Sequence, residues 1–404
     1  MRAEFRVSTA AGAVTAPPSK SMAHRMLVCA GLSGGPCTVS GISDSQDMLA
    51  TMNCLQALGV TCTRQGDKVT LQGGDLFTAP KEVVSCGESG STLRFFVPLF
   101  LLGRQKVTLT GEGRLMERPM GVYQTLCRER SLLFYPDGNK LYLRGPLQPG
   151  LYTVPGDVSS QFISGLLFAL PLLEAGSVLS LVPPVESRPY IEMTRQAQAL
   201  FGVTSVWTDE YTLRIPGGQC YCPVDTVVEG DWSNAAFLDG FSLLGGRVTT
   251  NGLIENSLQG DKIYKEYYKL LQNGCPTLDI QQCPDLGPVL MALAAACNGA
   301  VLTGTRRLAM KESDRGAAMA EELAKLGVQC VVEEDTITIP AGQLQPPAVP
   351  LNGHNDHRVV MALSLLLSRL GGSIEGAQAV RKSFPDFFAA IRSLGIEVEL
   401  HEDL

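Results

Sequence analysis

Short amphipathic helical patterns that end at a glycine recur along the chain, and each is followed by a short apolar strand. They read LQALGVTCT, QALFGVTSV, LLQNGCPTL, LAKLGVQCV and IRSLGIEVE. A glycine directly after the last apolar position of a helix is typical of a left-handed residue that ends it. The pattern therefore predicts five helices that close at left-handed glycines: Gly59, Gly202, Gly274, Gly327 and Gly395.

Four other segments combine polar turn residues with strict alternation of apolar and polar positions. They are TRQGDKVTLQGG, FYPDGNKLYLRG, VWTDEYTLRIPGG and VVEEDTITIPAG. Such alternation on both sides of a polar turn predicts a β-hairpin. The spacing of the repeats is too long and irregular for a solenoid of short repeats. It favours several copies of one helix-strand-hairpin unit, distributed over two α/β domains.

Length and composition agree with two soluble domains. A chain of 404 residues exceeds the usual size of one hydrophobic core, and 45% apolar with 18% charged residues is typical of a globular protein. The N-terminal segment MRAEFRVSTAAGAV has scattered charges and no apolar core of a secretory signal, so it predicts a first strand. The loop-like segment GGQCYCPVDTVVEGD places a domain crossing near residue 227, although a long surface hairpin is the alternative.

Charge, hydropathy and cysteine spacing exclude several classes of partner. The net charge of -7 and the pI near 5.3 argue against broad binding to nucleic acid or acidic membranes, so an anionic ligand must meet a local cluster of cations. The longest apolar stretches are interrupted well short of the roughly 20 residues of a membrane helix. The 12 cysteines lack CxxC pairs, and the CxC of Cys220 and Cys222 alone makes no zinc site. We expect core cysteines in a reducing compartment and no metal.

The segment PPSKSMAHRMLVCAG places polar side chains on the first turns of an apolar helix. Lys20, Ser21, His24 and Arg25 lie there, beside backbone N–H groups that have no partner within the helix. Cations beside such a helix start form an anion site. A capped helix with solvated cations is the alternative for this segment taken alone.

The segment CGESGSTLRFFVPLFLLG repeats this design with Gly87, Gly90 and Arg94. Neither GxxxxGK[ST] nor GxGxxG occurs, so ATP and NAD lose support. A glycine turn that only packs a helix explains the segment about as well as a phosphate site. In GDVSSQF, neutral hydroxyls and an amide precede another apolar helix and suit a phosphate or a polyhydroxy ring.

The second half of the chain carries its own polar segments. In KESDR, the spacing places Lys311, Glu312 and Arg315 on one helical turn, and ordinary salt bridging is the alternative to catalysis. So many cation-bearing helix starts in an acidic protein predict one shared cleft. With Asp285 and Glu312 in its walls, such a cleft could bind two phosphorylated or carboxylated ligands and move protons between them.

Eight motifs, in this order over nearly the full chain, resemble the 5-enolpyruvylshikimate-3-phosphate (EPSP) synthase family of enolpyruvyl transferases. The resemblance implies an α/β fold of two similar domains, each with three βαβαββ units around a pseudo-threefold axis, and an active site in the interdomain cleft. It further implies a continuous domain at 14–226 with most shikimate 3-phosphate contacts. A discontinuous domain, 1–13 plus 227–404, would carry many phosphoenolpyruvate contacts. The motifs are PPSKSMAHR, GESGSTLR, GEGRLMERPM, GDVSSQF, SRPYI, KESDR, NDHRVVMA and KSFPDFF.

The implied reaction transfers the enolpyruvyl group of phosphoenolpyruvate to the 5-hydroxyl of shikimate 3-phosphate and releases phosphate. The resemblance implies addition and elimination through a tetrahedral intermediate, with domain closure by induced fit and no metal or organic cofactor. It places the enzyme in the shikimate pathway to chorismate and the aromatic amino acids. We expect a cytoplasmic monomer with two small-molecule substrates and without nucleic-acid or membrane partners.

The resemblance assigns roles by matching motif. Asp285 corresponds to the base near the reacting hydroxyl and Glu312 to the acid that protonates the methylene carbon, with Lys20 as a rival for part of the proton transfer. The implied shikimate 3-phosphate residues are Lys20, Ser21, Arg25, Ser159, Ser160, Gln161, Ser187, Asp285 and Lys311. The implied phosphoenolpyruvate residues are Lys20, Gly90, Arg118, Gln161, Arg315, Arg358 and Lys382.

Three positions depart from the usual family pattern. Glu88 stands where Asn is usual, and Ser91 replaces a common Thr. The Glu88 carboxylate would repel phosphoenolpyruvate unless it turns away or pairs with Arg94 or another cation. Arg307 stands where some members have a polar amide near the shikimate phosphate. Two rival functions stay open: the sister transferase that acts on UDP-N-acetylglucosamine, and a non-catalytic phosphometabolite-binding protein.

Overall fold

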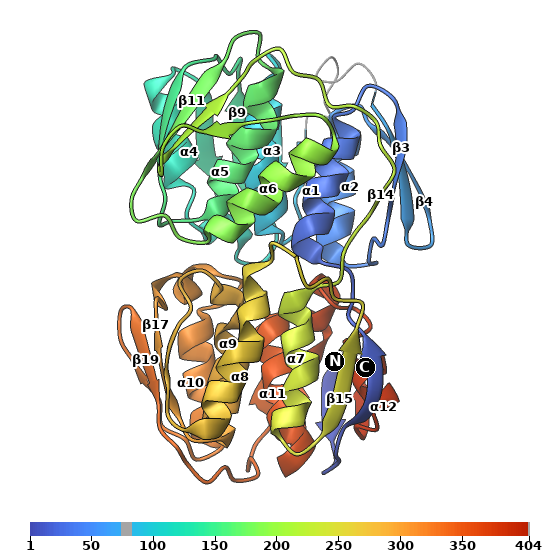
Figure 1. Cartoon of the computed structure of the whole chain (residues 1–404), viewed down its shortest axis with the longest axis vertical. Coiled ribbons are helices and arrows are strands. Elements are labelled where there is room, and N and C mark those ends of the chain that lie inside the picture. Colours follow the sequence, from blue (N-terminus) through green and yellow to red (C-terminus); the bar gives the residue numbers. More distant parts are fainter. Residues whose placement is uncertain (74–82, 403–404) are drawn as a thin grey trace. The chain divides into compact units, whose positions relative to one another are not determined.

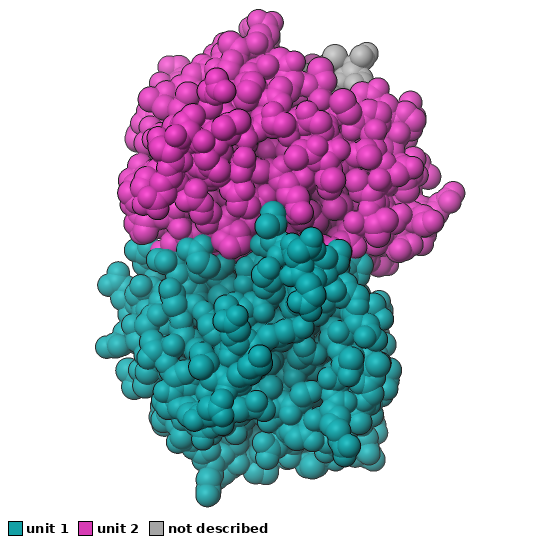
Figure 2. Space-filling model, in the orientation of Figure 1, with its two compact units in different colours: residues 1–19, 230–404 teal, residues 20–229 magenta. Residues whose placement is uncertain are grey.

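The computed structural model describes residues 1–73 and 83–402. Contacts divide these residues into two compact units, coloured separately in Figure 2: unit 1 comprises Met1–Ser19 and Gly230–Leu404, and unit 2 comprises Lys20–Glu229. The resemblance implies domain boundaries between residues 13 and 14 and between residues 226 and 227. Strand β2 (Ala11–Thr15) pairs in parallel with β15 (Arg247–Asn251), which fixes residues 11–15 within unit 1.

Unit 2 contains three four-stranded sheets built in one order. In each sheet a parallel pair of strands is followed by two strands of an antiparallel hairpin. The three sheets lie on the outside of the unit and surround helices in its interior (Figure 1). The sheets are β14 (Thr226–Val227), β3 (Pro36–Ser40), β5 (Lys68–Gln72), β4 (Thr61–Gln65); β6 (Val83–Ser85), β7 (Val107–Thr110), β9 (Lys140–Arg144), β8 (Leu133–Asp137); and β10 (Leu151–Pro155), β11 (Ser177–Val182), β13 (Thr212–Ile215), β12 (Val206–Trp207).

Helices α3 and α5 of unit 2 are buried along nearly their whole length, whereas α4 and α6 bury one face. Helix α3 packs against α5, α5 against α6, and α6 against α1. Their first turns carry the polar motifs, so the buried core holds the backbone of those motifs in place. The helices are α1 (Lys20–Gly31), α2 (Gln46–Ala57), α3 (Gly90–Leu101), α4 (Gly121–Glu129), α5 (Ser160–Ala169) and α6 (Arg188–Leu200).

Unit 1 repeats the arrangement with one change. Two of its sheets have four strands, whereas the third is the parallel pair of β2 and β15 alone among the described residues. The N-terminal strand expected from the sequence is β1, which pairs with strands from the end of the chain. The four-stranded sheets are β16 (Thr277–Asp279), β17 (Ala300–Thr303), β19 (Thr336–Ile339), β18 (Val331–Val332); and β20 (Leu351–Asn352), β21 (Gly372–Glu375), β1 (Arg2–Phe5), β22 (Val398–His401).

Helices α7, α9 and α11 form the interior of unit 1. Helix α11 packs against α9 and α7, with β17 and β19 on one side and β15 on the other (Figure 1). Helices α9 and α11 are buried along almost their whole length. The helices are α7 (Trp232–Leu243), α8 (Tyr264–Asn273), α9 (Gly287–Ala296), α10 (Arg315–Lys325), α11 (His357–Leu370) and α12 (Phe387–Ser393).

All four predicted hairpins are present as antiparallel pairs: β4 with β5, β8 with β9, β12 with β13, and β18 with β19. Four of the five predicted glycines are left-handed, with φ between 80° and 99° at Gly59, Gly202, Gly327 and Gly395. The prediction for Gly274 is wrong, because its φ of 162° is extended. The chain there runs from α8 into β16, which pairs in parallel with β17 and belongs to no hairpin.

The expectation of core cysteines is only partly correct. Cys29, Cys54 and Cys86 are buried among apolar side chains, but Cys220, Cys222 and Cys275 are exposed. The first two of these exposed residues lie in the loop-like segment that had suggested a domain crossing. Within the described residues, none of the helices has the length and apolar character that crossing a membrane requires.

Candidate active-site residues in each unit

The start of α1 brings Lys20 to a carboxylate of α2. Lys20 Nζ lies 2.9 Å from Asp47 Oδ2, and both side chains are largely buried. The ion pair fixes the ammonium group at the first helical position, beside N–H groups that have no acceptor within the helix. Asp47 lies in the first turn of α2, where a carboxylate is favoured by the helix dipole. Lys20 is therefore held in one place before any ligand arrives.

Arg25 is buried without a carboxylate partner among the residues that the structure describes. Its Nε donates to Thr194 Oγ1 at 2.8 Å, Nη1 donates to the Ser21 carbonyl at 2.6 Å and Nη2 to the Tyr190 carbonyl at 3.0 Å. Burial lowers the pKa of Arg25 to about 10. A cation held only by neutral oxygens leaves a positive charge that an anion would balance.

The start of α3 lies against a guanidinium group. Ser89 caps the helix by accepting a hydrogen bond from the Thr92 N–H. A Cβ atom built on Gly90 would lie 2.6 Å from Arg118 Nη1, so the Arg118 guanidinium occupies the space that only a glycine leaves open. Helix N–H groups and a guanidinium at one point form a site for a phosphate or carboxylate.

Gly90→Ala should raise KM for an anionic substrate bound at this point about tenfold, because the added methyl group displaces the Arg118 guanidinium. The matched control is Gly121→Ala at the start of α4, where an added Cβ meets nothing within 4 Å. Steady-state kinetics of both variants test the prediction. Equal KM values for the two variants would contradict it.

Gln161 connects two of the predicted motifs by its side chain. Its Nε2 donates to Ser91 Oγ at 2.9 Å, and its Oε1 accepts from Arg94 Nη1 at 2.6 Å. Ser159 caps α5 by accepting from the Gln161 N–H, and Ser160 is the first helical residue. Helix α5 thus begins where the sequence predicted, with its hydroxyl and amide groups on the first turn.

Two more residues of unit 2 bear on the predicted site: Ser187 by its backbone conformation and Glu88 by the position of its side chain. Ser187 precedes α6 and is left-handed, with φ of 55°. Such a conformation in a non-glycine residue is costly and concentrates at functional sites. The Glu88 carboxylate lies beside the loop that follows β7, where a Cβ on Gly113 would lie 2.6 Å from its Oε2. The Glu88 side chain therefore lies next to Gly113.

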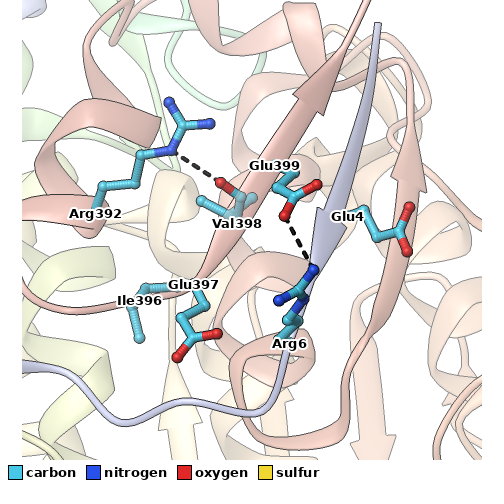
Figure 3. A pocket seen from close by; sticks show the side chains of 7 residues that line it. All are labelled: Glu4, Arg6, Arg392, Ile396, Glu397, Val398 and Glu399. Atoms are coloured by element: carbon cyan, nitrogen blue, oxygen red, sulfur yellow. Dashed lines mark hydrogen bonds and ion pairs between the residues drawn. The ribbon is translucent and has the colours of Figure 1, made fainter.

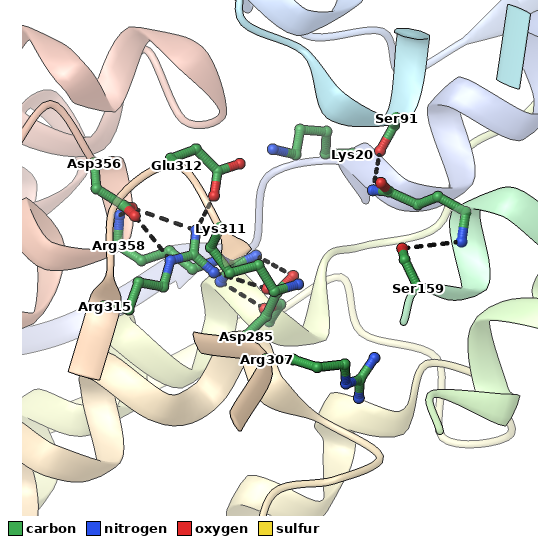
Figure 4. Close-up of polar contacts among 12 residues, drawn as sticks. Lys20, Ser91, Ser159, Asp285, Arg307, Lys311, Glu312, Arg315, Asp356 and Arg358 are labelled. Atoms are coloured by element: carbon green, nitrogen blue, oxygen red, sulfur yellow. Dashed lines mark hydrogen bonds and ion pairs between the residues drawn. The ribbon is translucent and has the colours of Figure 1, made fainter. Parts of the chain in front are cut away.

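In unit 1, three cations surround one carboxylate (Figure 4). Asp285 Oδ1 lies 2.8 Å from Arg315 Nη1 and 3.2 Å from Lys311 Nζ, and its Oδ2 lies 3.1 Å from Arg358 Nη2. Burial favours the protonated form, but Arg358, Lys311 and Arg315 outweigh it and hold the pKa of Asp285 well below its usual range. Asp285 is therefore a carboxylate at neutral pH.

Arg315 is the centre of this cluster. Its guanidinium donates to Asp285, to Glu312 Oε2 at 2.7 Å and to Asp356 Oδ2 at 2.8 Å. Burial alone would lower the pKa of Arg315, but Asp356, Glu312 and Asp285 raise it above the usual value. The helical spacing predicted for KESDR is wrong, because Asp314 caps α10 and the helix begins only at Arg315.

The start of α11 supplies further members of the cluster. Asp356 caps the helix by accepting from the Arg358 N–H, and Arg358 Nη1 donates to Ser233 Oγ at 2.7 Å. Lys382 Nζ donates to the Asn355 carbonyl at 2.6 Å, so it lies one residue from Asp356. Buried Arg307 donates to the Gln281 carbonyl.

The family model of EPSP synthase (3-phosphoshikimate 1-carboxyvinyltransferase) matches residues 6–273 and 266–391. The chain belongs to the EPSP synthase family. Proteins named 3-phosphoshikimate 1-carboxyvinyltransferase from Clostridium kluyveri and Clostridium acetobutylicum are 38% and 35% identical to it. Both alignments cover 96% of this chain and 96% of the relative.

Solved structures show the same fold as this EPSP synthase family member. EPSP synthase from Acinetobacter baumannii has a TM-score of 0.78 at 24% identity, and the match covers 99% of this chain and 100% of that chain. The enolpyruvyl transferase NikO from Streptomyces tendae has a TM-score of 0.78 at 12% identity over 98% of each chain. The family, the fold class and the transferase class predicted from the motifs are thus confirmed.

Sequence reasoning missed several residues of the two clusters in this family member. Asp47 pairs with Lys20, and Asp356 accepts hydrogen bonds from both Ser313 and Arg315. The position of Asp356 directly before an apolar helix could have indicated its capping role. No local pattern pointed to Asp47, because its partner lies 27 residues away.

Two other features of unit 1 lie apart from the cluster. A pocket is lined by Glu4, Glu397 and Glu399 beside Arg6 and Arg392 (Figure 3), and its excess of carboxylates does not suit a phosphorylated ligand. The possible ligand atoms of Glu321, Glu322 and His354 lie within 4.8 Å of one another. However, Lys325 Nζ already donates to both Glu322 oxygens, so an ammonium group takes the place of a metal ion.

Proposed function

We propose that this protein transfers the enolpyruvyl group of phosphoenolpyruvate to the 5-hydroxyl of shikimate 3-phosphate, giving 5-enolpyruvylshikimate 3-phosphate and phosphate. The observation that carries the proposal is the family match over residues 6–391, which includes every residue assigned a role below. The reaction places the protein in the shikimate pathway to chorismate and the aromatic amino acids.

Shikimate 3-phosphate is proposed to bind mainly through unit 2. The buried charge of Arg25, which lacks a carboxylate partner among the described residues, suits an anionic group of this substrate. Hydroxyl and amide groups at the starts of α5 and α6 suit its phosphate and ring hydroxyls. The proposed contacts are Lys20, Ser21, Arg25, Ser159, Ser160, Gln161 and Ser187, with Asp285 and Lys311 from unit 1.

Phosphoenolpyruvate is proposed to bind through cations of both units. The Gly90 amide and the Arg118 guanidinium are close enough to share one anionic group. Arg358 is paired with Asp285, and Lys382 donates to the Asn355 carbonyl. The positive charge of both side chains would also attract the reacting anion. Arg315 would act while bonded to three carboxylates, so it contributes charge rather than a free donor set. Lys20 and Gln161 are proposed to contact both substrates.

Asp285 is the proposed base. In the ligand-free protein, Arg358, Lys311 and Arg315 lower its pKa and make it a weak base. Two polyanionic substrates would draw Lys311 and Arg358 toward their own charges, which weakens this effect and makes Asp285 more basic. Asp285 then takes the proton of the 5-hydroxyl of shikimate 3-phosphate while the hydroxyl oxygen attacks C2 of phosphoenolpyruvate.

Glu312 is the proposed acid for the addition step. The negative charge of the two bound substrates would favour the neutral carboxylic acid form of Glu312, which takes up its proton from solvent. As the C2–O bond forms, this acid donates the proton to the methylene carbon, which becomes a methyl group in a tetrahedral intermediate. Elimination then breaks the bond between C2 and the phosphate oxygen, and a proton leaves the methyl group to restore the double bond. Lys20, fixed by Asp47, is the alternative donor for part of this proton transfer.

The pH profile should show a loss of activity above pH 8. Burial lowers the pKa of Lys311 to about 8, although the Asp285 carboxylate partly offsets this. The free enzyme therefore loses one positive charge above that pH, and kcat/KM for shikimate 3-phosphate should fall about tenfold per pH unit. Lys311→Arg keeps its charge, so its profile should lack this decrease.

The control for this profile is Lys325→Arg, which alters an ammonium group paired with Glu322 on α10. It should keep the wild-type decrease. A decrease at the same pH in Lys311→Arg would show that another group titrates and would overturn the role of Lys311.

The experiment that tests the proposed function is phosphate release from phosphoenolpyruvate with shikimate 3-phosphate, unphosphorylated shikimate or UDP-N-acetylglucosamine as acceptor. We expect rapid phosphate release only when shikimate 3-phosphate is the acceptor. Release with UDP-N-acetylglucosamine would instead identify the sister transferase. Binding of shikimate 3-phosphate without turnover would indicate a non-catalytic binding protein.

We further expect a cytoplasmic monomer that needs no metal or organic cofactor and has no nucleic-acid or membrane partner.

A further inference from the structure

Four buried polar side chains of unit 2 form one continuous hydrogen-bond chain. His24 Nδ1 lies 2.7 Å from Thr51 Oγ1, which lies 2.8 Å from Thr92 Oγ1. Thr92 Oγ1 donates to Ser89 Oγ at 2.8 Å, and Ser89 also accepts from the Thr92 N–H. All four side chains are at most 1% exposed.

The direction of every bond in this chain follows from the number of available hydrogens. The hydroxyl hydrogen of Thr92 is used toward Ser89, so Thr51 must donate to Thr92. The hydroxyl hydrogen of Thr51 is then used as well, so His24 must donate from Nδ1. His24 therefore carries a hydrogen on Nδ1, and its buried Nε2 has no hydrogen-bond partner among the described residues.

The electrostatic surroundings agree with a neutral ring. Burial lowers the pKa of His24 well below its usual value, and the nearby cations Lys20 and Arg25 lower it further. The ring packs edge-on against Phe95, with 6.3 Å between centroids. A neutral His24 therefore keeps its Nδ1 hydrogen available for Thr51 across the physiological pH range.

The chain joins α1, which carries Lys20, through α2 to the start of α3, which carries Gly90. His24 lies one turn after Lys20 on α1, Thr51 lies one turn after Asp47 on α2, and Thr92 and Ser89 enclose Gly90 at the start of α3. We propose that His24 is a positioning residue, which fixes the first turn of α3 relative to Lys20 and so sets the geometry for phosphoenolpyruvate. The inference rests on the proposed function only for the identity of that ligand.

The hydrogen-bond chain suits a role in positioning α3 better than a role in stabilising the fold. Apolar side chains of similar shape could fill this buried space without leaving an unpaired ring nitrogen. A chain of directional bonds, by contrast, is fully satisfied in only one arrangement of the three helices. Because Gly90 lies between Ser89 and Thr92, a shift of that turn moves the Gly90 amide relative to Lys20 and to Arg118.

The matched variants are His24→Leu and His24→Asn, which have nearly the same side-chain shape. Only Asn retains a donor at the position of Nδ1. His24→Leu should raise KM for phosphoenolpyruvate roughly tenfold and leave KM for shikimate 3-phosphate within about twofold. His24→Asn should keep both KM values near wild type, and Thr51→Val should behave as His24→Leu.

A double variant separates positioning from stability. His24→Leu and Thr51→Val should each lower Tm by a few degrees, because the first leaves Thr51 Oγ1 without its donor and the second breaks the bonds of Thr51 to His24 and to Thr92. The double variant removes both partners and should recover most of the lost Tm, while KM for phosphoenolpyruvate stays raised. Leu179→Ala on β11 is the control for stability and should lower Tm without changing this KM. A KM that follows Tm through the whole set would overturn the proposal.

Hydrogen exchange tests the same inference without any substrate. In the ligand-free protein, the amides of residues 90–93 should exchange faster in His24→Leu than in wild type or His24→Asn. Unchanged exchange in His24→Leu would contradict a positioning role, whatever the enzyme's activity. If wild type shows no phosphate release but the exchange rates differ as expected, the proposed function fails and the positioning role stands.

Discussion

Asp285→Asn should lower kcat by about 10³-fold without raising KM for either substrate. The amide cannot accept the hydroxyl proton, so the addition step loses its base. At the same time Lys311, Arg315 and Arg358 lose the carboxylate that neutralises them, which leaves more positive charge for anionic substrates. We therefore expect KM for phosphoenolpyruvate to fall or stay constant while kcat collapses.

The control for Asp285→Asn is Asp279→Asn, on the exposed end of β16. Asp279 accepts a hydrogen bond from the Gln281 N–H, a contact that Asn can keep. Steady-state kinetics with both substrates should give wild-type values for this control. If kcat of Asp285→Asn falls less than tenfold, or if KM rises in proportion to the loss, Asp285 is a binding residue and another group is the base.

Glu312→Gln should lower kcat by about 10²- to 10³-fold, because Gln cannot donate a proton to the methylene carbon. Arg315 keeps its bonds to Asp285 and Asp356, so the cluster should remain folded. In D2O, wild type should incorporate deuterium at the methylene carbon of phosphoenolpyruvate, and the variant should lose this incorporation together with turnover.

Asp314→Asn removes a charge two residues from Glu312 and serves as its control. Asp314 caps α10 through the Ala317 N–H, and Asn caps helices about as well as Asp. Its kcat and deuterium incorporation should stay near wild type. Deuterium incorporation that survives in Glu312→Gln would assign the proton donor to another residue, with Lys20 as the first candidate.

Local patterns predicted the repeated elements of the fold well. The turn residues and alternation that mark a hairpin lie within about a dozen positions, and all four hairpins were found. Gly274 shows the limit of such reasoning. Its local pattern matches the other four glycines, yet its φ of 162° is extended, so this pattern alone does not fix a left-handed residue.

The candidate site was predictable where helix starts carry the chemistry. Lys20, Gly90, Ser159 and Arg358 all lie at the first turns expected from sequence. The partners that hold these residues come from distant segments, as Asp47 does for Lys20 and Thr194 for Arg25. Periodicity reports burial and local conformation but not which distant helix supplies the partner. The hydrogen-bond chain from His24 to Ser89 required the structure for the same reason.

The most direct test of enolpyruvyl transfer is the fate of the bridging oxygen of phosphoenolpyruvate. Wild-type protein is incubated with shikimate 3-phosphate and phosphoenolpyruvate labelled with 18O between C2 and phosphorus, and the released phosphate is examined by 31P NMR. Addition and elimination at C2 predict that the label leaves with phosphate. Phosphate that carries no label would mean cleavage between oxygen and phosphorus, and would contradict the account.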